Sequence, residues 1–181
     1  MSLLASGAEE VRTATFPRTV KSVQDAAFGR RKRLRFVVLN EGLECVGRLA
    51  GGGQYYSGTF EKTRLRHVCL PSTLKTLGDN TFQWCEQLRS VSFTGHSSLT
   101  EIGDGCFSCS GLEEFRAPQS LRKIADRAFY FCERLRLVDL NEGLRALGRT
   151  GRPGGIGVFA GAQFEEVELP ATLRTLGDGA F

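Results

Sequence analysis

The 181-residue sequence predicts a solenoid, mostly β, in which seven copies of a unit of about 23 residues stack on one another with hydrogen bonds between their strands. Three observations predict it. The segment LPSTLKTLGDNTF at 70–82 returns as LPATLRTLGDGAF at 169–181, with nine of thirteen positions identical. One phenylalanine marks each unit, and an apolar residue opens the next unit five or six residues after each of the first six of them. These phenylalanines recur every 22 to 32 residues, at Phe28, Phe60, Phe82, Phe107, Phe129, Phe159 and Phe181.

The copies define the organisation of the chain. Residues 1–10 form an N-terminal extension and residues 11–181 the solenoid, with Gly-rich insertions near 48–59 and 149–158. The pentapeptide LNEGL stands before both insertions, at 39–43 and 140–144, so a block of four copies is duplicated. The chain ends on its seventh phenylalanine, and we expect the solenoid to continue beyond residue 181 or its open end to pair with another molecule. The copies begin at Val11, Leu34, Leu65, Leu88, Leu112, Leu135 and Phe164.

Each part of the unit predicts a local structure. In LRHVCLP, Val68 and Leu70 alternate with polar positions, as in a strand with one buried face, and Pro71 ends that strand because it lacks an N–H. The following TLKTLG is suited to a turn or a second short strand. Asp79 then resembles a helix N-cap, with Phe82 in a single helical turn behind it.

Composition favours an ordinary globular chain, with 41% hydrophobic and 24% charged residues. No apolar run reaches the length of a membrane span, and neither a signal peptide nor an Asn-linked glycosylation motif is visible, which favours a cytoplasmic location and six free cysteines. The net charge of +4 is small, and its densest cluster, GRRKRLR at 29–35, is typical of a solvated turn. We therefore expect no nucleic-acid or membrane partner.

The repeat resembles a known family. The run L-x-x-V-x-L-P-x-x-L-x-x-I-G-x-x-A-F-x-x-C is similar to the BspA-like, or Treponema-type, leucine-rich repeats, and LRKIADRAFYFCERLRLVDL at 121–140 is a close match. The resemblance covers residues 11–181. It implies a leucine-rich-repeat solenoid of the α/β horseshoe type, with a parallel sheet on the concave face and short strands, turns and single-turn helical segments elsewhere. Members are commonly bacterial surface or adhesion proteins or belong to expanded protist families.

The concave face is the predicted binding surface, and the predicted function is a non-catalytic protein-protein interaction module with a partner of unknown identity. A structural spacer without a specific site is the main alternative. Strand alternation points Thr13 and Thr15 outward in the first copy. The predicted partner-binding residues are the corresponding outward pairs of the next six copies, namely Phe36, Val38, His67, Cys69, Ser90, Ser92, Glu114, Arg116, Leu137, Asp139, Glu166 and Glu168.

The remaining candidate chemistry is weak. Cys69 and His67 share one strand face and could serve an enzyme or a metal ion, but a metal site needs three or four ligands, so we expect neither catalysis, a metal nor a cofactor. Tyr55 and Tyr56 in the first insertion are candidate loop contacts. The other five cysteines are interpreted as small residues that fit between copies, namely Cys45, Cys85, Cys106, Cys109 and Cys132.

Overall fold

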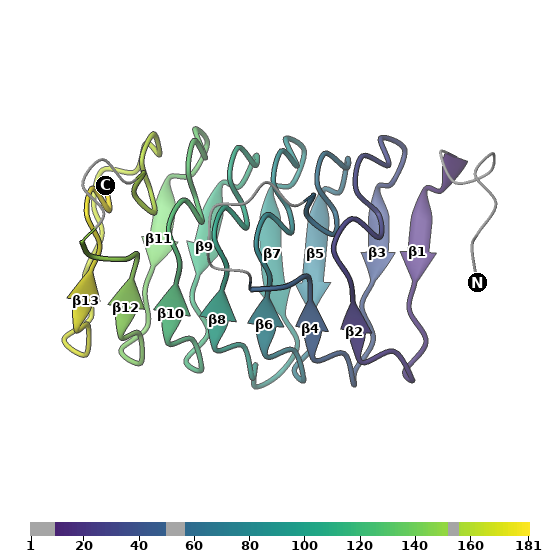
Figure 1. Cartoon of the computed structure of the whole chain (residues 1–181), viewed down its shortest axis with the longest axis horizontal. Coiled ribbons are helices and arrows are strands. Elements are labelled where there is room, and N and C mark those ends of the chain that lie inside the picture. Colours follow the sequence, from purple (N-terminus) through teal and green to yellow (C-terminus); the bar gives the residue numbers. More distant parts are fainter. Residues whose placement is uncertain (1–9, 50–56, 152–155) are drawn as a thin grey trace.

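Two rows of short parallel strands run along an elongated solenoid, with β1 at one end of the molecule and β13 at the other (Figure 1). The computed structural model describes residues 10–49, 57–151 and 156–181. The long-strand row comprises β1 (Thr13–Thr15), β3 (Phe36–Val38), β5 (His67–Leu70), β7 (Ser90–Phe93), β9 (Glu114–Arg116) and β11 (Leu137–Asp139). The short-strand row comprises β2 (Ser22–Val23), β4 (Cys45–Val46), β6 (Thr76–Leu77), β8 (Glu101–Ile102), β10 (Lys123–Ile124), β12 (Ala146–Leu147) and β13 (Thr175–Leu176).

The predicted mostly β solenoid is confirmed, and so is the second short strand of each unit. The short-strand row is one continuous seven-stranded parallel sheet, with one strand for each predicted copy. The long-strand row is divided into three parallel pairs, β1–β3, β5–β7 and β9–β11. Register follows the repeat, because His67 lies opposite Ser90 and Leu137 opposite Glu114, each 23 residues away.

The strand expected at Glu166 to Glu168 is wrong, since no strand is formed there in the part of the chain that the structure describes. Continuing the register of β9 and β11 would set Glu168 opposite Asp139, as Asp139 itself lies opposite Arg116. Like charges at directly opposed positions destabilise a strand pair, whereas opposite charges stabilise it. Glu168 would therefore face a like charge, whereas Asp139 lies opposite the oppositely charged Arg116.

The turns that carry the seven phenylalanines form a third side of the solenoid, here called the turn edge. The single-turn helical segments predicted behind the aspartates are not found within residues 10–49, 57–151 and 156–181. In the third copy the N–H of Gln83 donates to the Asn80 carbonyl at 3.1 Å and that of Cys85 to the Phe82 carbonyl at 3.2 Å, as in successive tight turns. The Asp79 carboxylate connects to the next copy, because its Oδ1 accepts the N–H of Asp104 at 2.9 Å.

Hydrogen bonds along the turn edge connect one copy to the next through each phenylalanine. The N–H of Phe28 donates to the Thr59 carbonyl at 2.8 Å, that of Phe60 to Thr81 at 2.8 Å and that of Phe82 to Cys106 at 2.7 Å. The same pattern continues from Phe107, Phe129 and Phe159, so the peptide groups before these residues form one chain from copy to copy. Left-handed residues two positions before and after the phenylalanine, such as Asn80 (φ 55°) and Trp84 (φ 59°), allow successive N–H groups to point the same way.

The phenylalanines stack into a column that forms the centre of the core. Neighbouring rings from Phe28 to Phe181 lie 5.2 to 5.7 Å apart between centroids, with interplanar angles between 7° and 21°. Phe115 of β9 packs on this column, with its ring 4.8 Å from that of Phe129. Most inward residues of both strand rows and of the segments between them, including Leu70, Leu74 and Leu77, are buried around it. Each copy thus buries its apolar residues against its neighbours.

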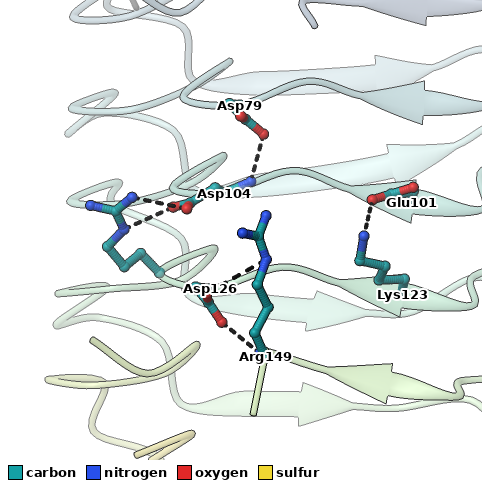
Figure 2. Close-up of polar contacts among 7 residues, drawn as sticks. Asp79, Glu101, Asp104, Lys123, Asp126 and Arg149 are labelled. Carbon is teal, nitrogen blue, oxygen red and sulfur yellow. Dashed lines mark hydrogen bonds and ion pairs between the residues drawn. The ribbon is translucent and has the colours of Figure 1, made fainter. Parts of the chain in front are cut away.

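A column of aspartate and arginine side chains follows the start of each turn. Asp104 accepts two hydrogen bonds of 2.8 Å from the Arg127 guanidinium. The Asp126 carboxylate accepts the backbone N–H of Arg149 at 2.7 Å, and Figure 2 shows these two residues side by side. In the copies with insertions this position is Arg48 or Arg149, and Arg48 binds Asp25 of the preceding copy at 2.7 Å. Arginine there relieves the repulsion that an unbroken column of aspartates would create.

In each half of the chain, the segment LNEGL is hydrogen-bonded to the segment LPSTL or LPATL of the following copy. The hydroxyl of Thr73 in LPSTL donates to the carbonyl of Leu43 in LNEGL at 2.8 Å, and Thr172 makes the same bond to Leu144 at 2.9 Å. Glu41 accepts hydrogen bonds from Ser72 at 2.8 Å and from Thr94, two copies further on, at 2.7 Å. These bonds, first the one from Thr94, lower the pKa of the Glu41 carboxyl. The two phrases therefore share their contacts to the preceding copy, whereas their leucines differ in burial: Leu70 and Leu77 are buried, but Leu169 and Leu176 are exposed.

Candidate interaction surface

The outward face of the long-strand row carries exposed apolar side chains at the positions that strand alternation predicts. Phe36 and Val38 are 58% and 46% exposed on β3, and Leu137 is 40% exposed on β11. The alternate residues Val68, Phe115 and Val138 are buried beneath the same row. Thr13 and Thr15 are exposed on β1, as predicted. The row therefore presents apolar groups to solvent at two separate places.

His67 of β5 is held by the neighbouring strand. Its Nδ1 lies 2.8 Å from the Ser90 hydroxyl and its Nε2 lies 3.1 Å from the Ser92 hydroxyl, so both ring nitrogens contact β7. Cys69 is exposed on the same face, as the sequence predicts. A base that activates Cys69 would instead direct one nitrogen at the thiol and be oriented by a third group. In the described part of the chain no three His, Cys, Asp or Glu residues are grouped as metal ligands.

A shallow depression of about 360 Å³ lies at the C-terminal end of this face. Arg116 and Glu114, whose side chains approach within 3.5 Å, lie on the strand that borders it. One arginine and three carboxylates, two of them in the segment that fails to form a strand, give the depression an acidic character. Five of the predicted partner-binding residues line it, namely Arg116, Leu137, Asp139, Glu166 and Glu168.

A second depression, of about 310 Å³, lies on the turn edge and was not predicted. Its exposed aromatic residues, Trp84 and Phe131, each stand two positions after an anchoring phenylalanine. That position holds Arg30, Lys62, Trp84, Cys109, Phe131 or Gly161 along the chain. The signal in the sequence is a large apolar side chain at a turn position that other copies fill with a charged or small residue.

Comparison with known families agrees with this architecture. The profile of the BspA type leucine rich repeat region matches residues 54–181, in six copies. The chain belongs to the BspA-type leucine-rich repeats. No curated protein sequence matches it at a significant level.

Solved structures of bacterial leucine-rich repeat proteins share the fold. A protein from Bacteroides ovatus is 23% identical with a TM-score of 0.64, and one from Eubacterium ventriosum is 20% identical with a TM-score of 0.72; each alignment covers 94% of this chain. A leucine rich cell surface protein from Faecalibacterium prausnitzii is 18% identical over 95% of this chain, with a TM-score of 0.50. This chain spans 46%, 42% and 45% of their respective lengths.

The cysteines of this BspA-type repeat fall into two groups. Cys85, Cys106 and Cys132 are buried between copies, as predicted, and burial raises the pKa of Cys85 to about 11 and that of Cys132 to about 12. The prediction is wrong for Cys109, which is partly exposed on the turn edge. It stands two residues after Phe107, while the buried position three residues after it holds Ser110.

Three further expectations concern the tyrosines of the first insertion, Cys45 and a membrane-spanning helix. Tyr55 and Tyr56 lie outside the described residues, as does part of the second insertion. Cys45, on β4 next to the buried Val46, is partly exposed like Cys109, so the prediction of a buried residue is wrong there too. Among the residues that the structure describes, no helix has the length and apolar character needed to cross a bilayer.

Proposed function

We propose that this chain is a non-catalytic protein-binding module that contacts its partner through the outward face of the long-strand row. The observation that carries the proposal is the exposure of Phe36, Val38 and Leu137 on the strands of this face. Apolar side chains held in solvent by a rigid sheet are typical of interaction sites. Repeat folds of this family are commonly used in protein-protein interaction and generally serve as scaffolds without enzymatic activity.

The two ends of the face favour different groups on the partner. Around β3 the exposed Phe36 and Val38 offer an apolar contact, while the depression near β11 combines Leu137 with the carboxylates of Asp139 and Glu168. A partner that covers the row would place an apolar side chain near Phe36 and a basic group in the depression.

The test is affinity capture from an extract of the source organism with the purified chain as bait, quantified by mass spectrometry. The double variant Phe36→Glu, Leu137→Glu places a charge at both apolar sites. Leu49→Glu, in the segment after β4, is the matched control, because Leu49 is 38% exposed and lies outside this face. Far-ultraviolet circular dichroism and urea unfolding establish that each variant is folded.

We expect proteins that bind the unmodified chain and the control to be lost with the double variant, since a carboxylate buried against an apolar surface is strongly unfavourable. Capture of the same proteins at the same levels by all three folded baits would refute this binding face. That result would instead support the alternative of a spacer without a specific site.

A further inference from the structure

The depression on the turn edge is a notch between two matching walls. Trp84 and Glu86 of the third copy form one wall, and Phe131 and Glu133 of the fifth copy form the other. Both pairs stand two and four residues after an anchoring phenylalanine. The copy between them contributes the floor, which consists of the small residues Cys109, Ser110 and Gly111.

The floor is recessed because its turn is one residue shorter. Leu88 follows Phe82 by six residues and Leu135 follows Phe129 by six, but Leu112 follows Phe107 by only five. The shortened turn brings Gly111 against the preceding copy, where its N–H donates to the Cys85 carbonyl at 3.2 Å. A Cβ at Gly111 would lie 2.2 Å from the Glu86 carbonyl oxygen, so no other residue fits without a backbone shift.

The aromatic wall at Phe131 is fixed from behind. A Cβ at Gly161, in the following copy, would lie 2.9 Å from Cδ2 of the Phe131 ring, which shows how closely this ring packs on the glycine. The Tyr130 ring lies 4.6 Å from it between centroids. Adjacent copies are separated by about 4.8 Å, so walls two copies apart leave about 10 Å between their backbones. A flat group can enter between side chains at that separation.

The notch is negatively charged. Its charged lining residues are Glu86, Glu133 and Arg134, two carboxylates against one guanidinium. Their field reaches the floor: burial is the main cause that raises the pKa of the Cys109 thiol, and the charges of Glu133 and Glu86 raise it further. A ligand with a positive charge is therefore favoured over a neutral or acidic one.

We propose that this notch receives the guanidinium group of an arginine side chain of a partner protein. A guanidinium is flat and cationic, stacks on tryptophan and phenylalanine rings, and pairs with a carboxylate through two parallel hydrogen bonds. A lysine ammonium satisfies the charge but not the planar contact. This inference rests on the proposed protein-binding function in one respect, that the arginine comes from a partner protein. The site itself is separate, because the notch lies on the turn edge and not on the long-strand row.

The test uses Trp84 as the reporter, because it is the only tryptophan of the chain. The full chain is titrated with N-acetyl-arginine amide, with the lysine equivalent and with the citrulline equivalent, which has nearly the shape of arginine without its charge. We expect the arginine compound to quench or shift Trp84 fluorescence in a saturable way. The lysine compound should bind at least about fivefold more weakly, because it loses about 1 kcal/mol of planar stacking. The citrulline compound should not bind, because it lacks the positive charge.

Variants locate the response. Glu86→Gln with Glu133→Gln keeps the shape of the walls and removes both charges, and we expect arginine to bind at least about tenfold more weakly. The double variant Glu10→Gln, Glu165→Gln removes two exposed carboxylates that line neither depression; it is the control and should bind as the unmodified chain does. Equal binding of citrulline and arginine, equal binding of lysine, or an unchanged affinity in the double variant would each overturn the proposal. Because no natural partner is used, failure here is distinguishable from failure of the long-strand face in the capture experiment.

Discussion

Replacing Phe107 by alanine should be among the most damaging single changes in the chain. Its ring is fully buried in the middle of the column and stacks on Phe82 and Phe129, each 5.4 Å away between centroids. Truncation of a buried phenylalanine to alanine costs about 3–5 kcal/mol, and each lost stacked pair accounts for about 0.5–1.5 kcal/mol. We therefore expect the free energy of unfolding to fall by about 4–5 kcal/mol.

Two further variants separate burial from stacking. Phe107→Leu retains an apolar side chain but loses two stacked pairs, which predicts a loss of about 1–3 kcal/mol. Phe181→Ala is the position control, because that ring is 53% exposed and its one stacked neighbour is Phe159, so we expect a loss of about 1 kcal/mol.

Urea unfolding followed both by Trp84 fluorescence and by circular dichroism measures all three variants. Coincident transitions justify a two-state free energy, while separated transitions in Phe107→Ala would show that the two halves of the solenoid have become uncoupled. A loss in Phe107→Ala no larger than that in Phe181→Ala would refute the view that the column holds neighbouring copies together.

Two other outcomes follow from the backbone and the thiols. Arg30→Gly should raise the free energy of unfolding by about 0.5–1 kcal/mol in urea titrations, because Arg30 has φ 62° and glycine relieves that strain. Arg31→Gly is the control: Arg31 lies outside the left-handed region, so this variant should be less stable than the unmodified chain. Stability should also decline as pH rises above about 9, because folding raises the pKa of Cys85 to about 11 and that of Cys132 to about 12: unfolded thiols ionise first, at about 1.4 kcal/mol per pH unit for each. The variant Cys85→Ala, Cys132→Ala should show a shallower decline in urea midpoints between pH 9 and 11, and an equal decline would contradict this assignment.

Much of the fold follows from periodicity. The recurring phenylalanines predict the stacked column, and alternation in segments such as 67–70 predicts which side of each strand is buried. The turns could not be derived in the same way. Asp79 carries the local pattern of a helix cap, but its carboxylate binds Asp104 of the next copy, a contact that depends on the stacking and not on the neighbouring sequence.

The candidate site was predictable where it depends on one strand and not where it depends on several copies. Phe36, Val38 and Leu137 are exposed because of strand alternation, which the sequence displays directly. The absence of a seventh strand is not visible in the alternation of its own segment, because the like charges that would oppose each other, Asp139 and Glu168, lie in different copies. The notch on the turn edge combines residues of three successive copies. It depends on a turn at Gly111 that is one residue shorter than the turns of the copies before and after it, and this difference matters only once the three turns lie side by side.

The hydrogen-bond chain of the turn edge also has an electrostatic consequence. Within a parallel sheet the peptide groups of a strand alternate in direction, so their dipoles largely cancel along the stacking axis. Along the turn edge the N–H groups of Phe28, Phe60, Phe82, Phe107, Phe129 and Phe159 all donate toward the C-terminal copy, so their dipoles add. This side of the solenoid should therefore carry a field like that of a helix, with its negative end at the first copy. The arginines and lysine of 30–33 lie at that negative end, where a positive charge is stabilised.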